Sequence, residues 1–342
     1  SIALISDRFP PAERGKALGT WNSLGPIATM IGPTLGGFLV DTLTWRTIFI
    51  PVLLVGLAAV WGLSRLVTAG QQQFARPGFL RTFDWPGVVF LAVATVGFFS
   101  FTSSRPITGV APLRDWRLLA LGLVGLMLFL GWERFRTEPF IRLALFRRST
   151  FSRASLTSAS RMFLMSAVFF LIPLYLTDIH QVSASGIGVQ LMIHGIGLLA
   201  TMRLGGQMAD RWGSRVPVML GAGGQMGAIV YLAFLPADTA LVWVTAGLVA
   251  HGLGAGLYLA PLHRAAMSCI PADQTGMAAG LYSMVRFAGS AMGSALAGVL
   301  LQAGLDSGAP PIQAYQTVLW ALAGMALLGV VIGGGLREHV SG

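Results

Sequence analysis

The sequence predicts an all-α polytopic membrane protein. Of its 342 residues, 54% are hydrophobic and only 11% are charged, and the mean hydropathy is +0.72. Soluble domains carry about 25% charged residues, so this composition is too apolar for a water-facing globule. The 44 glycines favour closely packed membrane helices. The single Cys269 excludes an intramolecular disulfide and a cysteine-based metal cluster.

Ten apolar stretches are each long enough to cross a bilayer as a helix. A hydrocarbon core about 30 Å thick needs about 20 apolar residues per helical span. Helices are expected because lipid leaves unpaired backbone groups unsatisfied. The predicted spans are 16–40, 46–67, 85–104, 116–133, 152–177, 186–206, 215–235, 240–262, 275–303 and 314–336.

The basic residues predict the orientation of these spans, because Lys and Arg are enriched on the cytoplasmic side. With residues 1–15 placed inside, sixteen of the 23 Lys and Arg residues fall in inside segments. Four fall in outside segments, namely Arg46, Arg105, Arg114 and Arg117. The remaining three lie within spans, namely Arg161, Arg203 and Arg286. Both ends of the chain are therefore predicted to be cytoplasmic. The net charge of +10 reflects this orientation and argues against nucleic acid as a partner.

A short polar motif joins the sixth and seventh predicted spans. It reads Gly206-Gln-Met-Ala-Asp210-Arg211-Trp-Gly213-Ser-Arg215. Gly206 is expected to let a neighbouring helix approach closely, and Gly213 to allow a tight reversal. Asp210 is placed to meet the positive end of a helix dipole or an arginine, while Arg211 and Arg215 hold the loop in the cytoplasm. The alternative is an ordinary turn between two helices with positive-inside residues.

A second motif lies in the first predicted span, with Gly19, Ala28 and then Gly32-Pro33-Thr-Leu-Gly36-Gly37. Pro33 removes a backbone donor and is expected to bend the helix. The flanking glycines are expected to let the helix pack tightly against a partner. The alternative is a generic packing face of small residues.

The two motifs resemble the signature loop and the antiporter motif of the major facilitator superfamily. Further segments resemble its fourteen-helix drug/proton antiporter branch: the loop 6–17, Trp45–Phe49, Asp84–Gly87 and the run 276–293. Matched to that template, residues 1–68 hold the end of helix four with helices five and six. Residues 69–149 hold two linker helices, and 150–342 form a complete second six-helix bundle. About ten transmembrane helices are then present, and the first three and most of the fourth are missing.

Ionisable and polar residues within the spans are candidates for a transport cavity, since such groups are costly in lipid. The candidates are Arg161, Arg286, Tyr282, His194, His251, Asn22 and Gln190. Arg286 lies about 16 Å into its span at 1.5 Å per residue, too deep for easy snorkelling, and Tyr282 shares its face. The alternative for Arg161 is a structural arginine paired with backbone carbonyls. The two histidines are either proton relays or hydrogen-bonded packing residues.

The resemblance implies a secondary transporter that exports amphipathic small molecules or drugs against proton entry, by alternating access. No carboxylate lies deep within the ten spans, so proton coupling is assigned here only to His194 or His251. The alternatives are a metabolite or nutrient permease of the same fold, and an inactive fragment of such a transporter.

An integral-membrane enzyme is disfavoured, since the sequence has no metal-spaced His/Glu set and no nucleophile constellation. No cofactor is expected, and the proton gradient supplies the energy. The expected partners are the lipid bilayer, a small-molecule substrate and an accessory efflux protein. The expected location is the bacterial inner membrane.

Overall fold

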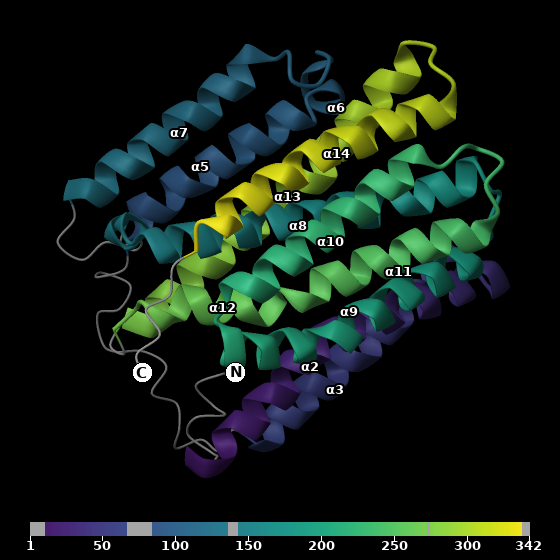
Figure 1. Ribbon diagram of the computed structural model, residues 1–342. Helices are drawn as coiled ribbons and strands as arrows, with labels where there is room; N and C mark the ends of the chain where they lie inside the picture. Colours follow the sequence, from purple (N-terminus) through teal and green to yellow (C-terminus); the bar gives the residue numbers. More distant parts are fainter. Residues whose placement is uncertain (1–10, 67–83, 136–142, 272–273, 337–342) are drawn as a thin grey trace.

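A computed structural model describes residues 11–66, 84–135, 143–271 and 274–336, and the described residues contain helices and no strands (Figure 1). All ten predicted spans are helical. Nine helical segments within the described residues are long and apolar enough to cross a membrane, and α2 is not among them. The expected tail of helix four and the loop 6–10 lie outside the described residues.

The ten spans correspond to the following elements, the first two of which are joined by the short helix η1 (Trp45–Ile48). They are α2 (Pro11–Thr42), α3 (Phe49–Leu66), α5 (Trp85–Thr102), α7 (Trp116–Phe135), α8 (Ser149–Asp178), α9 (Ala184–Trp212), α10 (Arg215–Phe234), α11 (Leu241–Leu257) with α12 (Leu259–Ser268), α13 (Thr275–Asp306) and α14 (Pro311–Gly334). A one-turn helix α6 (Arg105–Thr108) follows α5, and η3 (Leu143–Arg147) precedes α8.

The last six spans, from α8 to α14, pack into one bundle. Helix α8 lies at its centre and packs against α12, α13 and α14. Glycines permit the closest contact, because a β-carbon on Gly289 or Gly293 of α13 would overlap backbone carbonyls of α8. One apolar core runs between α8, α10, α11, α13 and α14 and includes Leu171, Ile229 and Tyr315.

The expected single span 240–262 is broken into α11 and α12 at Tyr258. Pro261 explains the break, because it lacks the N–H that would bond the carbonyl of Leu257 four residues earlier. The helical path then continues to Ser268, beyond the predicted end. The break thus exposes a carbonyl in the interior of the bundle.

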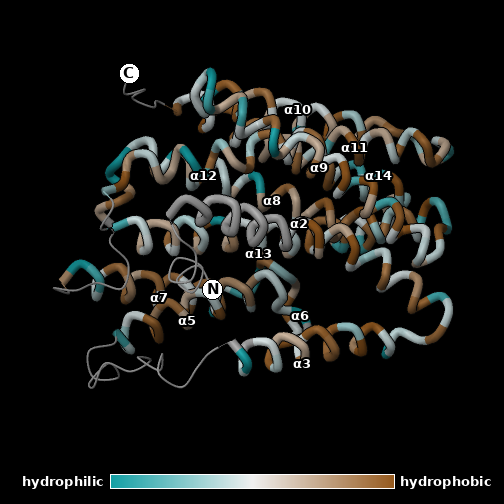
Figure 2. Tube along the Cα trace, turned by 90° about the horizontal axis from the view of Figure 1, so that it is seen from below, coloured by the Kyte–Doolittle hydropathy of each residue, from teal (hydrophilic) through white to brown (hydrophobic). Residues whose placement is uncertain are grey.

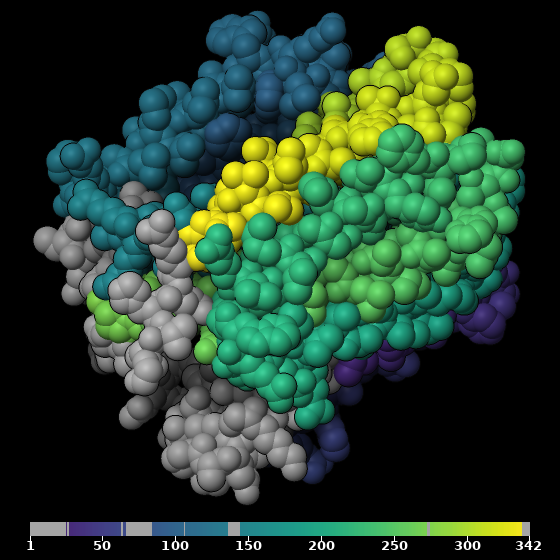
Figure 3. All heavy atoms as spheres, viewed as in Figure 1, coloured from purple at the N-terminus to yellow at the C-terminus, as the bar shows by residue number. Residues whose placement is uncertain are grey.

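The linker helices and α2 lie on opposite flanks of the bundle (Figure 1). The linker pair α5 and α7 packs against itself and touches α13, while α2 packs along α9. Figures 1 and 3 show α13 and α14 (yellow) between the linker pair (blue) and the green helices α10 and α11. Helix α3 lies along one edge, apart from the others (Figure 2), and none of its apolar window is buried.

Candidate functional site

The second motif packs α2 backbone against α9 backbone. A β-carbon on Gly37 would overlap the carbonyl of Ala184, and one on Gly188 would lie 2.6 Å from the carbonyl oxygen of Pro33. The hydroxyl of Thr34 donates to the carbonyl of Gly188 at 2.9 Å. We call this contact, from Met30 to Asp41 on α2, the α2–α9 seam.

Gly32 and Gly36 of this motif do not share in the close contact with the described residues. A β-carbon on Gly32 or Gly36 would meet nothing within 4 Å, so the tight packing expected of the flanking glycines is found at Gly37 alone among these three. Gly19 and Asn22 lie on α2, but their surroundings are outside the described residues.

Asp41 closes one end of the α2–α9 seam. Its Oδ2 accepts a hydrogen bond from the backbone N–H of Ser185 at 2.7 Å, in the first turn of α9. A carboxylate is favoured there because the first N–H groups of a helix lack partners and carry positive charge. Hydrogen bonds from Ser185 hold the pKa of Asp41 below its usual value, so the carboxylate is charged at neutral pH.

The signature motif forms the turn between α9 and α10. Gly213 has φ of +76°, a conformation that favours glycine, as expected for the tight reversal. Asp210 meets an arginine from another helix, since Arg264 Nη1 of α12 lies 2.5 Å from Asp210 Oδ1. Arg211 and Arg215 are exposed on the two sides of the turn. The motif therefore ties the end of α9 to α12.

The close approach expected at Gly206 occurs one residue earlier. A β-carbon on Gly206 would lie 3.9 Å from the β-carbon of Ala260, an ordinary contact, whereas one on Gly205 would overlap the carbonyl of Leu257. This is the carbonyl freed by Pro261 at the break. Gly205 is therefore required because the broken helix presses its free carbonyl against α9.

Arg161 lies buried inside the bundle. Its side chain is 3% exposed, and its Nε donates to the carbonyl of Ala255 at 2.8 Å, just before the break. The guanidinium also lies over the ring of Tyr258, 5.7 Å from the centroid. This geometry fits the alternative of an arginine paired with a backbone carbonyl.

His194 and His251 lie side by side in the bundle interior. Nε2 of His194 is 3.0 Å from Nδ1 of His251, and Nε2 of His251 is 3.0 Å from Nε2 of Gln225 on α10. The hydroxyl of Tyr258 donates to Oε1 of Gln225. All four side chains are buried. We call these four residues and Arg161 the buried polar network.

Gln190 lies outside this network, one helical turn before His194. It accepts a hydrogen bond from the hydroxyl of Thr245 at 2.8 Å and so links α9 to α11. Its side chain is buried. The arrangement is that of a polar packing pair.

Arg286 and Tyr282 lie together on α13. The ring of Tyr282 packs edge-on against His263 of α12, with 5.5 Å between centroids. Arg286 is half-buried; its guanidinium lies 4.9 Å from the ring centroid of Phe287, and its buried Nε has no hydrogen-bond partner within the part of the chain that the structure describes. We call Arg286, Tyr282 and His263 the α13 cluster, in which a half-buried cationic group lies beside two aromatic rings.

The family of the chain follows from comparison with known proteins. The sequence profile of the Major Facilitator Superfamily matches residues 1–294 and, in a second match, residues 154–338. The chain belongs to the Major Facilitator Superfamily. The solved structure of a bacterial homologue of the human lysosomal transporter Spinster aligns with a TM-score of 0.53 at 13% identity, over 97% of this chain and 71% of that one, and so has a similar fold.

Curated relatives are similar over most of the chain. Multidrug resistance protein Stp of Mycobacterium tuberculosis (strain ATCC 25618 / H37Rv) is 31% identical over 313 residues, which is 91% of this chain and 57% of Stp. Riboflavin transporter RibZ of Clostridioides difficile (strain 630) is 26% identical over 86% of this chain and 62% of RibZ. The chain therefore spans less than two thirds of the length of these relatives.

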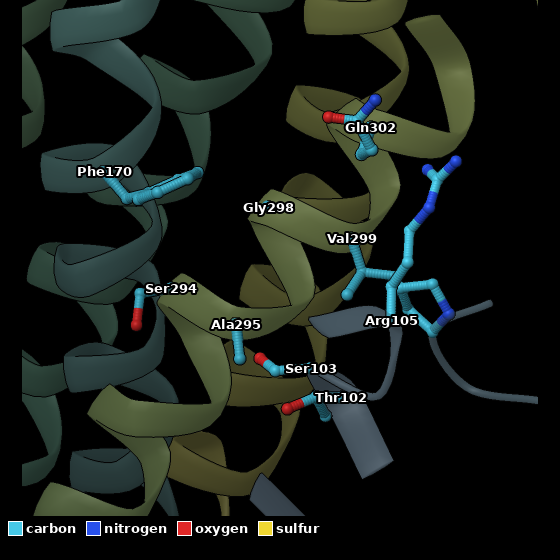
Figure 4. A pocket seen from close by; sticks show the side chains of 10 residues that line it. Thr102, Ser103, Arg105, Phe170, Ser294, Ala295, Gly298, Val299 and Gln302 are labelled. Atoms are coloured by element: carbon cyan, nitrogen blue, oxygen red, sulfur yellow. The ribbon is translucent and has the colours of Figure 1, made fainter. Parts of the chain in front are cut away.

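A pocket lies at the bundle surface, where the end of α5 and the segment after it meet α8 and α13 (Figure 4). The pocket has a volume of about 450 Å³ and lies between α5, α8 and α13. Arg105 at its rim pairs with Asp306 at 3.1 Å, and Phe170 and Gln302 line it. Because Arg105 is already paired, the α13 cluster is the better candidate for binding a charged substrate.

Sequence reasoning missed three residues that the fold brings to these sites. Gln225 and Tyr258 complete the buried polar network, and His263 faces Tyr282. A signal was available for Gln225, which is a lone amide in the apolar span 215–235. His263 lies beyond the predicted end of its span, because the apolar pattern does not predict that the helix continues after the break.

Proposed function

We propose that this chain is part of a proton-coupled exporter of amphipathic small molecules, of the fourteen-helix drug/proton antiporter branch. Members of this fold rock two bundles around a site near the bilayer midplane. The observation that carries the proposal is the α2–α9 seam, where the antiporter-type motif meets the second bundle backbone to backbone. The similarity to a protein named for multidrug resistance supports export of drugs.

The seam is suited to a contact that forms and breaks. It consists of backbone contacts at Gly37 and Gly188, one hydroxyl bond from Thr34 and the Asp41 contact at the end of α9. Such small-residue contacts let two helices meet closely without interlocking large side chains. A transporter that opens at this end would separate these groups and expose them to water, which satisfies them at low cost.

The α13 cluster is proposed to bind the substrate. Arg286 offers a guanidinium whose Nε has no hydrogen-bond partner among the described residues, and the exposed His263 supplies an aromatic ring. A planar aromatic molecule with a carboxylate fits this combination, because arginine binds carboxylates and stacks on flat rings. The expected substrates are therefore anionic or zwitterionic amphipathic compounds.

A reconstituted transporter tests the proposal. The complete protein is placed in proteoliposomes with an imposed pH gradient, and two fluorescent probes are followed: ethidium, a permanent cation, and a fluoroquinolone, which carries a carboxylate. Uphill movement of the fluoroquinolone that a protonophore abolishes is the expected result. Transport of neither probe in either direction would contradict a drug exporter.

A metabolite permease is the second candidate, favoured by the similarity to a protein named as a riboflavin transporter. Riboflavin is fluorescent and is tested in the same vesicles. Saturable riboflavin uptake without fluoroquinolone movement would favour this second function.

A further inference from the structure

We propose that His194 and His251 form the proton-binding site that couples proton entry to movement of α9 against α2. This inference rests on the proposed proton-coupled function. The pair is buried between α9 and α11, with His194 1% and His251 0% exposed. Ionisable groups at such positions in membrane proteins are rare and commonly serve proton relays.

The hydrogen bonds around the pair run in one direction. Tyr258 donates to Oε1 of Gln225, so the Gln225 amide nitrogen donates to Nε2 of His251. A neutral His251 then carries its proton on Nδ1 and donates to Nε2 of His194. The proton of His194 is left on Nδ1, which is buried and has no hydrogen-bond partner among the described residues.

This neutral arrangement has no free acceptor for another proton. A proton added to His194 Nε2 would set that N–H head-on against the Nδ1–H of His251. Two changes relieve the clash. In the first, the two rings move apart. In the second, His251 changes tautomer, with its single proton on Nε2 in place of Nδ1, and the amide of Gln225 rotates so that its oxygen accepts a hydrogen bond from Nε2. The hydroxyl of Tyr258 must then rotate as well, because it now faces the amide nitrogen. Protonation is therefore transmitted from α9 to the helix break at Tyr258.

The positive charge of Arg161 opposes protonation of the histidine pair. Among the described residues, Arg161 of α8 is the charged group that interacts with both histidines. From the same helix, Phe169 packs edge-on against His194 with 5.3 Å between centroids. A hydrogen bond to the carbonyl of Ala255 holds Arg161 close to the histidines. The pair therefore binds a proton more readily when α8 or the helix break has shifted and has moved Arg161 away. Binding is thus tied to conformation.

The pair lies directly behind the α2–α9 seam. Gly195, the residue after His194, faces Met30 of α2, and a β-carbon there would lie 3.0 Å from the β-carbon of Met30. On the other side, a β-carbon on Gly252 would overlap the carbonyl of His194. A small displacement of His194 therefore acts on the contact between the two halves of the transporter.

Two variants of the pair separate proton coupling from transport. His194→Gln and His251→Gln keep hydrogen-bonding groups but cannot be protonated, and His180→Gln, in the loop after α8, is the control. In proteoliposomes, both network variants are expected to lose pH-driven accumulation of the fluoroquinolone by about tenfold, within the usual range of site-to-site coupling. Exchange of the probe at equal pH is expected to persist. Unchanged pH-driven accumulation in His194→Gln would overturn the proposal.

A second measurement does not depend on the substrate. Nitrogen-15 NMR of histidine-labelled protein in bilayers reports the protonation of each ring nitrogen, and the variants assign the signals. The pH is lowered from about 8 to about 4, and one proton is expected to bind to the pair, because imidazole is the side chain that takes up a proton nearest to neutral pH. A pair that stays neutral throughout would overturn the site. If the pair binds a proton but the wild-type protein shows no pH-driven transport, the proton-binding site is supported and the proposed function is contradicted.

Discussion

The carbonyl oxygen of Leu257 occupies the position that a β-carbon on Gly205 would take. Pro261 leaves this carbonyl without its helical partner, and Gly205 is the residue of α9 that admits it. The signature loop begins directly after this contact. The break in one helix and the glycine in another thus form a single structural unit.

Gly205→Ala tests this unit. The added methyl group forces α9 and the break apart, and overpacking of this kind costs about 1–3 kcal/mol. A lower melting temperature of the purified protein and reduced transport are expected. The matched control is Gly206→Ala, where the new methyl group would make an ordinary contact with Ala260. Equal effects of the two substitutions would contradict the close approach at Gly205.

Gly37→Ala tests the α2–α9 seam. The new β-carbon overlaps the carbonyl of Ala184, so the seam cannot close and transport is expected to fall. Gly36→Ala, one residue earlier, meets open space and is expected to transport normally. A crosslink between cysteines placed on α2 and α9 measures closure directly. Crosslinking that is equally efficient in both variants would show that Gly37 is not needed for the seam.

Asp210→Asn tests the ion pair with Arg264. Both side chains are well exposed, so membrane insertion and melting temperature are expected to remain near wild type. Transport is expected to slow by about two- to fivefold, matching the modest strength of an exposed pair. Exchange of the two residues, Asp210→Arg with Arg264→Asp, is expected to restore part of the rate. Normal transport by Asp210→Asn would remove the conformational role of the pair.

Arg161→Met and Arg286→Met are expected to act differently. Loss of Arg161 leaves the Ala255 carbonyl without its donor, and an unsatisfied buried group costs about 1–3 kcal/mol, so thermal stability falls. Arg286 has no hydrogen bond to lose at Nε, so its substitution keeps stability and weakens transport of the carboxylate probe. Thermal unfolding and fluoroquinolone uptake, measured on the same preparations, distinguish the two roles. A loss of stability in Arg286→Met, together with a loss of transport alone in Arg161→Met, would contradict both assigned roles.

The helices could be predicted from the sequence, because apolar length alone defines a span in lipid. The turn at Gly213 could also be predicted, since its spacing is specific. The break at Tyr258 could not, because Pro261 lay near the end of an apolar run that still reads as one span. The pairing of His194 with His251, 57 residues apart, depends on how α9 and α11 are rotated about their axes, and periodicity in an apolar helix does not show this rotation.

Three alternate glycines of α11 face different neighbours. β-carbons on Gly252 and Gly256 would overlap carbonyls of α9, and one on Gly254 would lie 2.5 Å from the backbone nitrogen of Gln225 on α10. With no side chain between these backbones, there is little room for sliding or bending among the three helices. We therefore expect α9, α10 and α11 to move together as one unit, so that a displacement of any one of them also changes the contact between α9 and α2.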